Sequence, residues 1–585
     1  MQRIDDHKNE NLWDPWHFLG PKRKKLLERS WAGVFRRFLF EELPVKEIAS
    51  RFDERMGRPT KELYTMVGLL VLEQMLDLSD EEVTVRLAFD EQFAYALDIP
   101  GDRDEDRYVC ERTLWEYRGI AMKRGLDKWL FENLTDTLLK AFGVDTSKQR
   151  LDSTHVCSNM RELRRGEIFA RVIAGFLRNL RRQQGAWYEQ VEKGGVDRYL
   201  KGEACACFSS VKPSEIKRTV AGMSEDLLWL VERFRGNQAV ERMNTYKMLV
   251  RVLEEQCEVI EEEGEEPRVQ LKKASEVPAD SLQNPSDPDA TYDKHKGQGY
   301  QIQIMETYQE ENSEEEKKGY RPPDLITYVD VEPAHKSDTD ALVPAIESTE
   351  ARGCKPEELL ADGGYGSDAN VERALEANVE VIAPANKGSS DEETLRLDDF
   401  ELDGETGEVI RCPAGEKPTK TGRTPKGHFT ANFDRAKCLV CPLRGRCPVR
   451  VSSRTARLKQ YTAKKMRLAR RRAEEKRQVF RDKYRWRAGV EATMSRYKSQ
   501  TGAERLRVRG LAAVRFAARM KALGLNILRC ARVAAETSKT IYSTYFGQKT
   551  PRVTFNTCLL GCLLHFFVRE AIQTRNQPLH RPLAA

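Results

Sequence analysis

The most informative stretch of this chain is YRWRAGVEATMSRYK, residues 484–498. Within it, Tyr484, Arg487, Glu491 and Lys498 stand at offsets of 0, 3, 7 and 14. If the stretch is a single α-helix, these four side chains fall within about 60° of one another. A carboxylate held between cations suits a metal ion and a phosphate backbone better than a hydrophobic core. The alternative is a solvated helix face with incidental charges.

Two further carboxylates lie upstream, each in a stretch that predicts a strand. Asp152 stands in QRLDSTHV, residues 149–156, and we expect it near the interior of a strand. A buried carboxylate there is costly unless it is paired or bound to a metal. Asp362 stands in ELLADGGYGS, residues 358–367, where a short apolar run ends in a glycine-rich loop before a helix that begins near Ser367. Taken alone, either aspartate could equally be a helix cap or a turn residue.

Taken together, Asp152, Asp362 and Glu491 resemble the Asp-Asp-Glu (DDE) transposases of bacterial insertion sequences, in the branch with a Tyr-Arg-Glu-Lys signature. The DSTH motif at Asp152, the DGGY motif at Asp362 and the preceding EPAHKSD, residues 332–338, are also similar to that branch. The resemblance covers about residues 55–530. It implies an RNase-H-like fold, a DNA partner and two Mg²⁺ ions, for which Mn²⁺ can substitute.

The resemblance also implies a role for each residue of the candidate site. Asp152 would bridge the two metal ions, and Asp362 and Glu491 would each complete one side. Arg487 and Lys498 would clamp backbone phosphates, and Tyr484 would bond a phosphate or stack on a base. The implied enzyme binds the terminal inverted repeats of its element as a homodimer, cuts the DNA and joins the 3′-OH ends to target DNA. A metal-dependent nuclease that does not join ends, or a catalytically inactive DNA-binding relic, is the alternative.

The charge distribution favours a nucleic-acid partner. The net charge is only +6, but residues 444–483 hold 16 Lys or Arg against 3 Asp or Glu, and residues 484–530 hold 11 against 2. Aromatic residues interrupt this basic block, as expected of a surface that follows phosphates. A solvated amphipathic helix is the alternative interpretation. We expect no membrane partner, because no apolar run reaches spanning length.

The cysteines predict a second metal site. The first residues of the chain are polar, so we expect no secretion signal, a cytoplasmic, nucleoid-associated bacterial protein and reduced thiols. Cys438, Cys441 and Cys447, spaced by two and five residues, follow an upstream Cys412. Four thiolates can complete a tetrahedral structural Zn²⁺ site. The alternative is a set of reduced cysteines in a loop-rich β insert.

The predicted fold class is α/β, an RNase-H-like core of mixed sheet and flanking helices that two inserts interrupt. Apolar residues at helical spacing in residues 60–130 predict an all-α domain before the core. We expect the following division: 1–145, a helical N-terminal domain for DNA-end binding or dimerisation; 146–160 and 290–386, the first part of the catalytic core; 161–289, a helical insert and linker; 387–460, a Cys-rich, mainly β insert; 461–535, the basic helical part of the core with Glu491; and 536–585, a C-terminal segment and tail.

Overall fold

The computed structural model describes residues 1–7, 14–192, 196–200, 211–262, 266–310, 321–385, 394–404, 406–458 and 460–545. The chain divides into two compact units, Met1–Val533 and Ala534–Ala585. Of the predicted C-terminal segment, residues 536–585, the part from position 546 onward lies outside the described residues. No helix within the described ranges combines the length and apolarity needed to cross a membrane.

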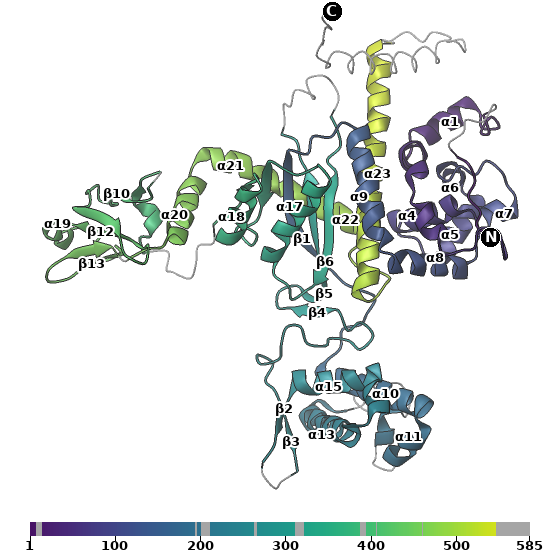
Figure 1. The fold of residues 1–585 in the computed structure, drawn as a ribbon, viewed down its shortest axis with the longest axis horizontal. Helices are drawn as coiled ribbons and strands as arrows, with labels where there is room; N and C mark the ends of the chain where they lie inside the picture. The colour runs from purple at the N-terminus through teal and green to yellow at the C-terminus, as the bar shows by residue number, and fades with distance from the viewer. Residues whose placement is uncertain are drawn as a thin grey trace, which may run out of the picture. The chain divides into compact units, whose positions relative to one another are not determined.

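Every regular element described before residue 148 is helical, and several of these helices pack against one buried helix (Figure 1). That helix is α4 (Leu63–Met75), in which every residue except Tyr64 is buried. The next helix, α5 (Asp80–Phe89), begins with a capping box: Glu82 N–H donates to Ser79 Oγ at 3.2 Å, and Ser79 N–H donates to Glu82 Oε2 at 2.7 Å. The remaining helices of this part are α1 (Pro21–Glu28), α2 (Trp31–Val34), the π-helix η1 (Phe35–Leu39), the 3₁₀-helix η2 (Phe40–Glu42), α3 (Val45–Ala49), α6 (Glu91–Ala96), α7 (Asp104–Arg107), α8 (Glu111–Lys123) and α9 (Leu126–Ala141).

A mixed six-stranded sheet follows, and it positions two of the three predicted acids. Strand β1 pairs antiparallel with β5 and parallel with β7, β7 pairs parallel with β8, and β5 also pairs antiparallel with β6 and β4. Between β5 and β6 the register runs from Tyr300 opposite Pro333 to Glu306 opposite Ile326, and apolar residues alternate in both segments. The strands are β1 (Lys148–Val156), β4 (Thr291–Asp293), β5 (Gly297–Thr307), β6 (Ile326–Pro333), β7 (Glu358–Ala361) and β8 (Glu380–Ile382).

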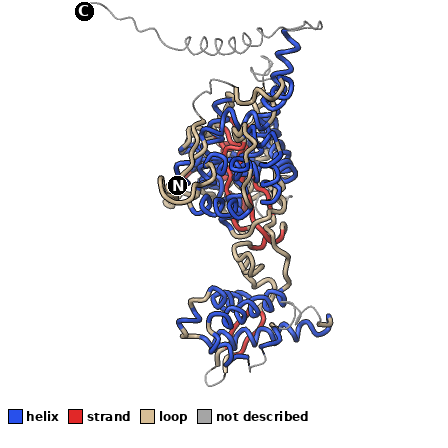
Figure 2. Tube along the Cα trace, turned by 90° about the vertical axis from the view of Figure 1, so that its right-hand side faces the viewer, coloured by secondary structure: helices blue, strands red, loops and turns tan. Residues whose placement is uncertain are grey.

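Helices from both ends of the chain cover this sheet (Figures 1 and 2). Asn526 of α23 (Leu511–Tyr545) accepts from Ile326 N–H at 2.8 Å and donates to Ile326 C=O at 2.9 Å, which fixes α23 on β6. Arg519 of the same helix pairs with Asp127 of α9 at 2.6 Å. α23 thus joins the N-terminal helices to the sheet. The helices α17 (Leu342–Ala351) and α18 (Asp368–Glu376) follow β6 and β7.

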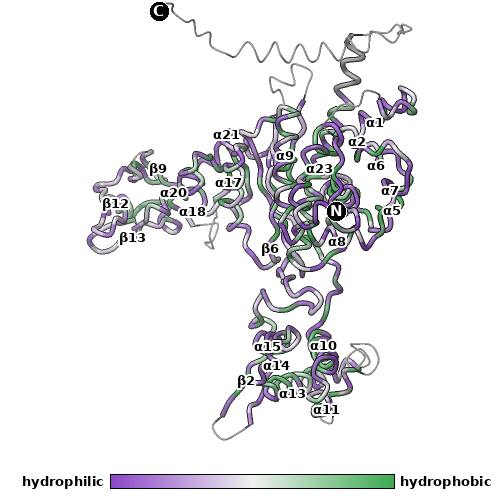
Figure 3. The backbone as a smooth tube through the Cα atoms, turned by 45° about the vertical axis from the view of Figure 1, so that its right-hand side comes forward, coloured by the Kyte–Doolittle hydropathy of each residue, from purple (hydrophilic) through white to green (hydrophobic). Residues whose placement is uncertain are grey.

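The insert between β1 and β4 has a hydrophobic core of its own, to which Phe176 and Phe234 contribute. Hydrophobic and hydrophilic residues are interleaved along α13 (Figure 3), and its buried residues, such as Leu227 and Val231, belong to that core. Within the predicted helical insert and linker, 161–289, residues 268–271 pair with residues 257–260 as a β-hairpin. The elements are α10 (Arg165–Gln183), α11 (Gly185–Glu192), η3 (Val196–Tyr199), η4 (Pro213–Glu215), α13 (Ile216–Phe234), α14 (Gln238–Glu241), α15 (Asn244–Gln256), β2 (Cys257–Ile260) and β3 (Arg268–Leu271).

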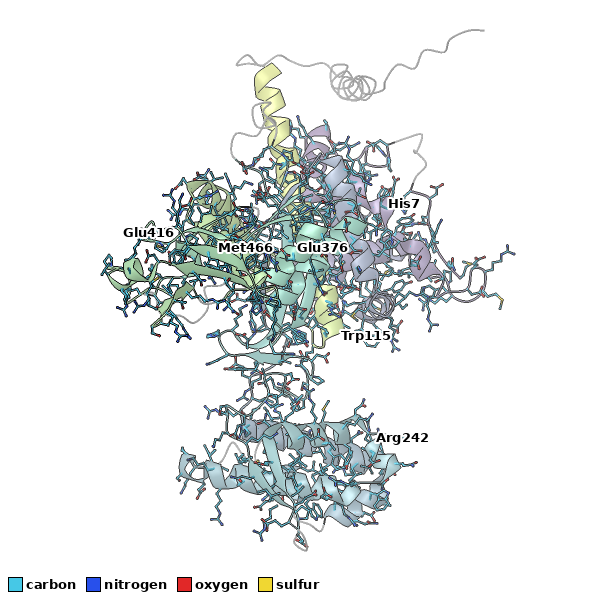
Figure 4. All side chains as sticks on the ribbon, turned by 60° about the vertical axis from the view of Figure 1, so that its left-hand side comes forward. His7, Trp115, Arg242, Glu376, Glu416 and Met466 are labelled. Carbon is cyan, nitrogen blue, oxygen red and sulfur yellow. The ribbon has the colours of Figure 1, made fainter. Side chains whose placement is uncertain are left out.

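The Cys-rich segment forms a four-stranded sheet and a two-stranded sheet around a small core. Its aromatic centre is Phe429 stacked on Tyr461, with ring centroids 5.1 Å apart. Met466 of the following helix, α20 (Ala463–Glu475), packs against the same core (Figure 4). The other elements are η6 (Leu397–Asp399), β9 (Glu401–Leu402), β10 (Val409–Arg411), β11 (Lys420–Arg423), β12 (Phe429–Phe433), α19 (Arg435–Leu439), β13 (Val449–Val451) and β14 (Ala456–Leu458).

Candidate active site

The stretch 484–498 is not the single α-helix that its spacing predicts. α21 (Gln478–Tyr484) ends at the first signature residue, a 3₁₀-helix, η7 (Arg485–Ala488), follows, and α22 (Gly489–Thr501) begins after it. The carbonyl of Trp486, inside the 3₁₀ turn, accepts from Arg150 Nη1 at 2.8 Å. This long-range contact occurs at the break. Because a 3₁₀ turn winds more tightly than an α-helix, the four signature side chains do not share one regular stripe.

Arg487 lies between two of the predicted acids. Its Nη2 donates to Asp152 Oδ2 at 2.9 Å, and its Nη1 donates to Glu491 Oε1 at 3.2 Å. The Asp152 side chain is 13% exposed and that of Glu491 is 68% exposed, so the first ion pair is the better shielded from solvent. The guanidinium predicted to clamp phosphate is therefore engaged by the acids themselves.

Strand register brings Asp362 beside Asp152. Leu151 pairs with Ala361 across the parallel strands β1 and β7, and each aspartate directly follows one of these residues. Burial raises the pKa of Asp152, Arg487 opposes that rise, and the negative charge of Asp362 adds to it. Asp362 Oδ1 accepts from the N–H of Gly364 at 2.8 Å in the loop after β7. The two carboxylates are thus electrostatic neighbours.

The structure adds a fourth acid, Asp338, which was not among the predicted site residues. Asp338 also raises the pKa of Asp152, and it accepts hydrogen bonds from Gln301 and, at 3.2 Å, from Gln303. A Cβ on Gly364 would lie 3.0 Å from the Oδ1 of Asp362 and 3.7 Å from the Cβ of Asp338, so this glycine packs between the two acids. The motif EPAHKSD, which ends at Asp338, was the signal that could have found it.

The two remaining signature residues, Tyr484 and Lys498, differ in their distance from the predicted acids. Tyr484 stacks on Phe480, with ring centroids 5.5 Å apart, and its pKa is raised by burial and by nearby Asp362 and Asp152. Lys498 has no hydrogen bond or ion pair to the three predicted acids in the part of the chain that is described. It instead helps to lower the pKa of His155, after the larger effect of burial. The structure thus places Tyr484 near the acids and Lys498 toward His155.

The donor set has the chemistry of a divalent-cation site. Asp152, Asp362, Asp338 and Glu491 offer carboxylate oxygens, which Mg²⁺ and Mn²⁺ prefer. Burial and mutual repulsion disfavour the charged form of Asp152, and a bound cation would relieve both effects. Within the described ranges, however, no three His, Cys, Asp or Glu side chains lie close enough together to hold a metal ion. Binding would require Glu491 to leave Arg487.

The four predicted zinc ligands gather around one small cavity. Cys412, Cys438, Cys441 and Cys447 all line a space of about 30 Å³ in the Cys-rich segment. None of them is in a disulfide. Burial raises the pKa of the Cys438 thiol, and the other three cysteines raise it further. The spacing of these cysteines in the sequence thus predicts a real spatial cluster, although its sulfur atoms are not at ligand distances from one centre.

Much of the basic block serves internal contacts and not an open surface. On α20, Arg467 pairs with Asp368 at 2.6 Å, and Arg471 donates to Gly366 C=O at 2.8 Å and to Ala383 C=O at 3.0 Å. These bonds hold α20 against the loop that follows Asp362, the start of α18 and the residue after β8. The contacts explain part of the local positive charge without a nucleic acid.

One comparison with known proteins bears on this site. Residues 411–531 match the family model described as a transposase DDE domain, and the matched segment contains Glu491, Arg487 and the cysteine cluster. No curated protein and no solved structure matches the chain. The mixed α/β sheet that carries Asp152 and Asp362 is consistent with such a domain. The family match supports a DDE transposase.

Proposed function

We propose that this protein binds the terminal inverted repeats of an insertion sequence, cuts the DNA and joins the 3′-OH ends to target DNA. The observation that carries the proposal is the guanidinium of Arg487 between Asp152 and Glu491. It supports a centre to which the sheet and α22 both contribute, and the family match includes Arg487 and Glu491 of that centre. The RNase-H-like architecture and a homodimer assembled on DNA belong to the same proposal.

In this proposal Asp152, Asp362 and Glu491 hold two Mg²⁺ ions, or Mn²⁺ in their place. Such ions activate a water molecule and stabilise the leaving 3′ oxygen in phosphodiester cleavage. The chain's own cations and aromatic residues hold the DNA. Arg487, once released from the acids, and Lys498 bind backbone phosphates. Tyr484, at the edge of the acidic centre, bonds a phosphate or stacks on a displaced base.

We also propose a structural Zn²⁺ at Cys412, Cys438, Cys441 and Cys447, because thiolate sulfur is a preferred ligand of this ion. The test is the zinc content of the purified protein by mass spectrometry. We expect about one zinc per chain in the wild type and a loss in Cys438→Ser, with Cys110→Ser, an exposed thiol elsewhere, as the control. A wild type without zinc would leave reduced cysteines as the better description.

The function is tested by cleavage and joining of the DNA that flanks the reading frame, in Mg²⁺, with wild type and Asp152→Asn. Cleavage at defined ends that yields a 3′-OH, followed by joining to a second DNA, is expected of the wild type only. Cleavage without joining would favour the nuclease. DNA binding without cleavage, in either Mg²⁺ or Mn²⁺, would favour the inactive relic.

Glu491→Gln supplies a second arm of the test. The change keeps the shape of the side chain and removes its charge. We expect it to abolish cleavage and to leave DNA binding intact. Unchanged cleavage would show that Glu491 is not a metal ligand.

A further inference from the structure

A buried ion network lies directly behind the acidic centre. Glu306 of β5 is completely buried, and it accepts from Arg150 Nε at 2.8 Å and from Arg529 Nη1 at 2.8 Å. The hydroxyl of Thr493 also lies 2.9 and 2.7 Å from the two carboxylate oxygens of Glu306. Both arginine side chains are less than one-tenth exposed. One carboxylate therefore gathers groups from β1, α22 and α23.

Two of the three partners of Glu306 are close in sequence to a residue of the acidic centre. Arg150 precedes Asp152 by two residues on β1, and Thr493 follows Glu491 by two residues on α22. Arg150 Nη1 also donates to the carbonyl of Trp486, the residue before Arg487. The network therefore ties the strand of one acid to the helix of another and to the turn that carries the bridging guanidinium.

The packing of Gly489 shows how tightly Arg150 is held in this arrangement. A Cβ at Gly489 would lie 2.0 Å from Arg150 Nη1 and 2.6 Å from Arg150 Cζ. Gly489 is in the ordinary right-handed helical region, with φ of −64°. Its lack of a side chain thus serves the close approach of the guanidinium and not a special backbone conformation.

Stability alone does not account for such a network. Burying charges costs solvation free energy, and well-packed apolar residues of similar volume are often as stable or more stable. Charge-assisted hydrogen bonds, by contrast, fix distance and direction between the elements that they join. The network's distinctive contribution is the orientation of α22 against β1. Rotation of α22 about its axis would both break the Thr493 bond and move Glu491.

We propose that Arg150, Glu306 and Thr493 are positioning residues that hold Glu491 and Arg487 in place relative to Asp152. The proposal rests on the proposed function, since it assigns these residues to the metal-dependent centre. They do not touch the DNA or the metal ions. They act through the helix and the turn that carry the residues that do.

The test is Thr493→Val, which removes the hydroxyl and keeps the shape. We expect the Mg²⁺ concentration for half-maximal cleavage to rise about tenfold and kcat to fall, with KM for DNA unchanged, because a hydrogen bond to a charged group is lost. Thr493→Ser should restore the wild-type Mg²⁺ dependence. Thr501→Val is the matched control, because Thr501 is buried on the same helix but bonds to Tyr497 C=O. It should lower the melting temperature without changing the Mg²⁺ dependence.

The outcomes separate this proposal from the proposed function. If the wild type does not cleave DNA, the proposed function fails. The positioning role is then tested without DNA, by comparing the Mn²⁺ affinities of Thr493→Val and Thr501→Val in electron paramagnetic resonance. If the wild type cleaves and both valine variants share its Mg²⁺ dependence, the positioning role is wrong. Should Thr493→Val not fold, Arg150→Lys decides by the same criteria, because it keeps the charge and shortens the reach to Trp486 C=O.

Discussion

Replacement of Arg487 by glutamine should have opposite effects on metal binding and on DNA cleavage. Arg487 occupies the space between Asp152 and Glu491, so it competes with any cation that uses both carboxylates. Arg487→Gln removes that competing charge. We therefore expect the variant to bind Mn²⁺ more tightly than the wild type in the absence of DNA. The same variant should cleave DNA more slowly, because a phosphate ligand is lost.

The structure sets the size of the expected gain. Two unit charges about 4 Å apart attract by about 4 kcal/mol at the effective dielectric constant of a protein surface. That figure applies to the shielded pair with Asp152 before the cost of desolvation is subtracted. The pair with Glu491, whose side chain is 68% exposed, adds at most about 1 kcal/mol. If about a third of the attraction between Arg487 and Asp152 remains after desolvation, Arg487→Gln gains about 1.4 kcal/mol in the free energy of Mn²⁺ binding, or tenfold in affinity.

The assay is titration of Mn²⁺ followed by electron paramagnetic resonance, on wild type, Arg487→Gln and Lys498→Gln without DNA. Lys498→Gln removes the same charge from the adjacent helix α22, but Lys498 has no described ion pair with the acids. It controls for long-range electrostatics and should change the affinity by less than about threefold. Equal tightening in both variants, or no tightening in Arg487→Gln, would refute competition by Arg487.

Three further changes follow from packing and burial. Gly489→Ala should lower the free energy of unfolding, measured in urea, by about 1–2 kcal/mol. The new methyl group would displace Arg150, and the cost of that displacement outweighs the gain of about 1 kcal/mol in helix propensity. An unchanged free energy of unfolding would contradict this expectation. Burial and Glu306 raise the pKa of Asp324 to about 6. The wild type therefore loses stability as the pH rises from about 4 to about 6, because the folded protein disfavours the charged form of Asp324. The free energy of unfolding of Asp324→Asn should rise by up to about 3 kcal/mol relative to that of the wild type between pH 4 and 7. A constant difference across that range would exclude the shift. Phe176→Ala should destabilise the helical insert by about 3–5 kcal/mol, because it leaves a cavity in the core of the insert. Hydrogen exchange should then show α10 and α13 opening while β1 and β5 stay protected. Loss of protection in the sheet as well would show that the insert does not open independently.

Much of the framework of the candidate site follows from local sequence patterns. The strand around Asp152 and the strand, loop and helix around Asp362 lie where those patterns predict them, because each depends on neighbours within a few residues. The capping box at Ser79 is local in the same sense. The close spacing of Cys438, Cys441 and Cys447 likewise predicts a cluster, although the participation of Cys412 depends on the fold.

Contacts between distant segments could not be predicted in this way. The break before α22 accompanies the bond from Arg150, and the occupation of the acidic centre by Arg487 depends on how β1 meets α22. Asp338 joins the centre through contacts with distant segments, because it accepts hydrogen bonds from Gln301 and Gln303 of β5 and lies against Gly364. The basic block illustrates the same limit, since the sequence shows its charge but not the ion pairs of Arg467 and its neighbours.

The sequence by itself determined the strand that carries Asp152 and the strand that precedes Asp362, and which residues could supply the chemistry. The tertiary structure alone decided which charges neutralise one another and which remain available to a ligand. The physical reason is that backbone preference acts over a few residues, whereas ion pairing and burial depend on distances that are set only when strands and helices pack.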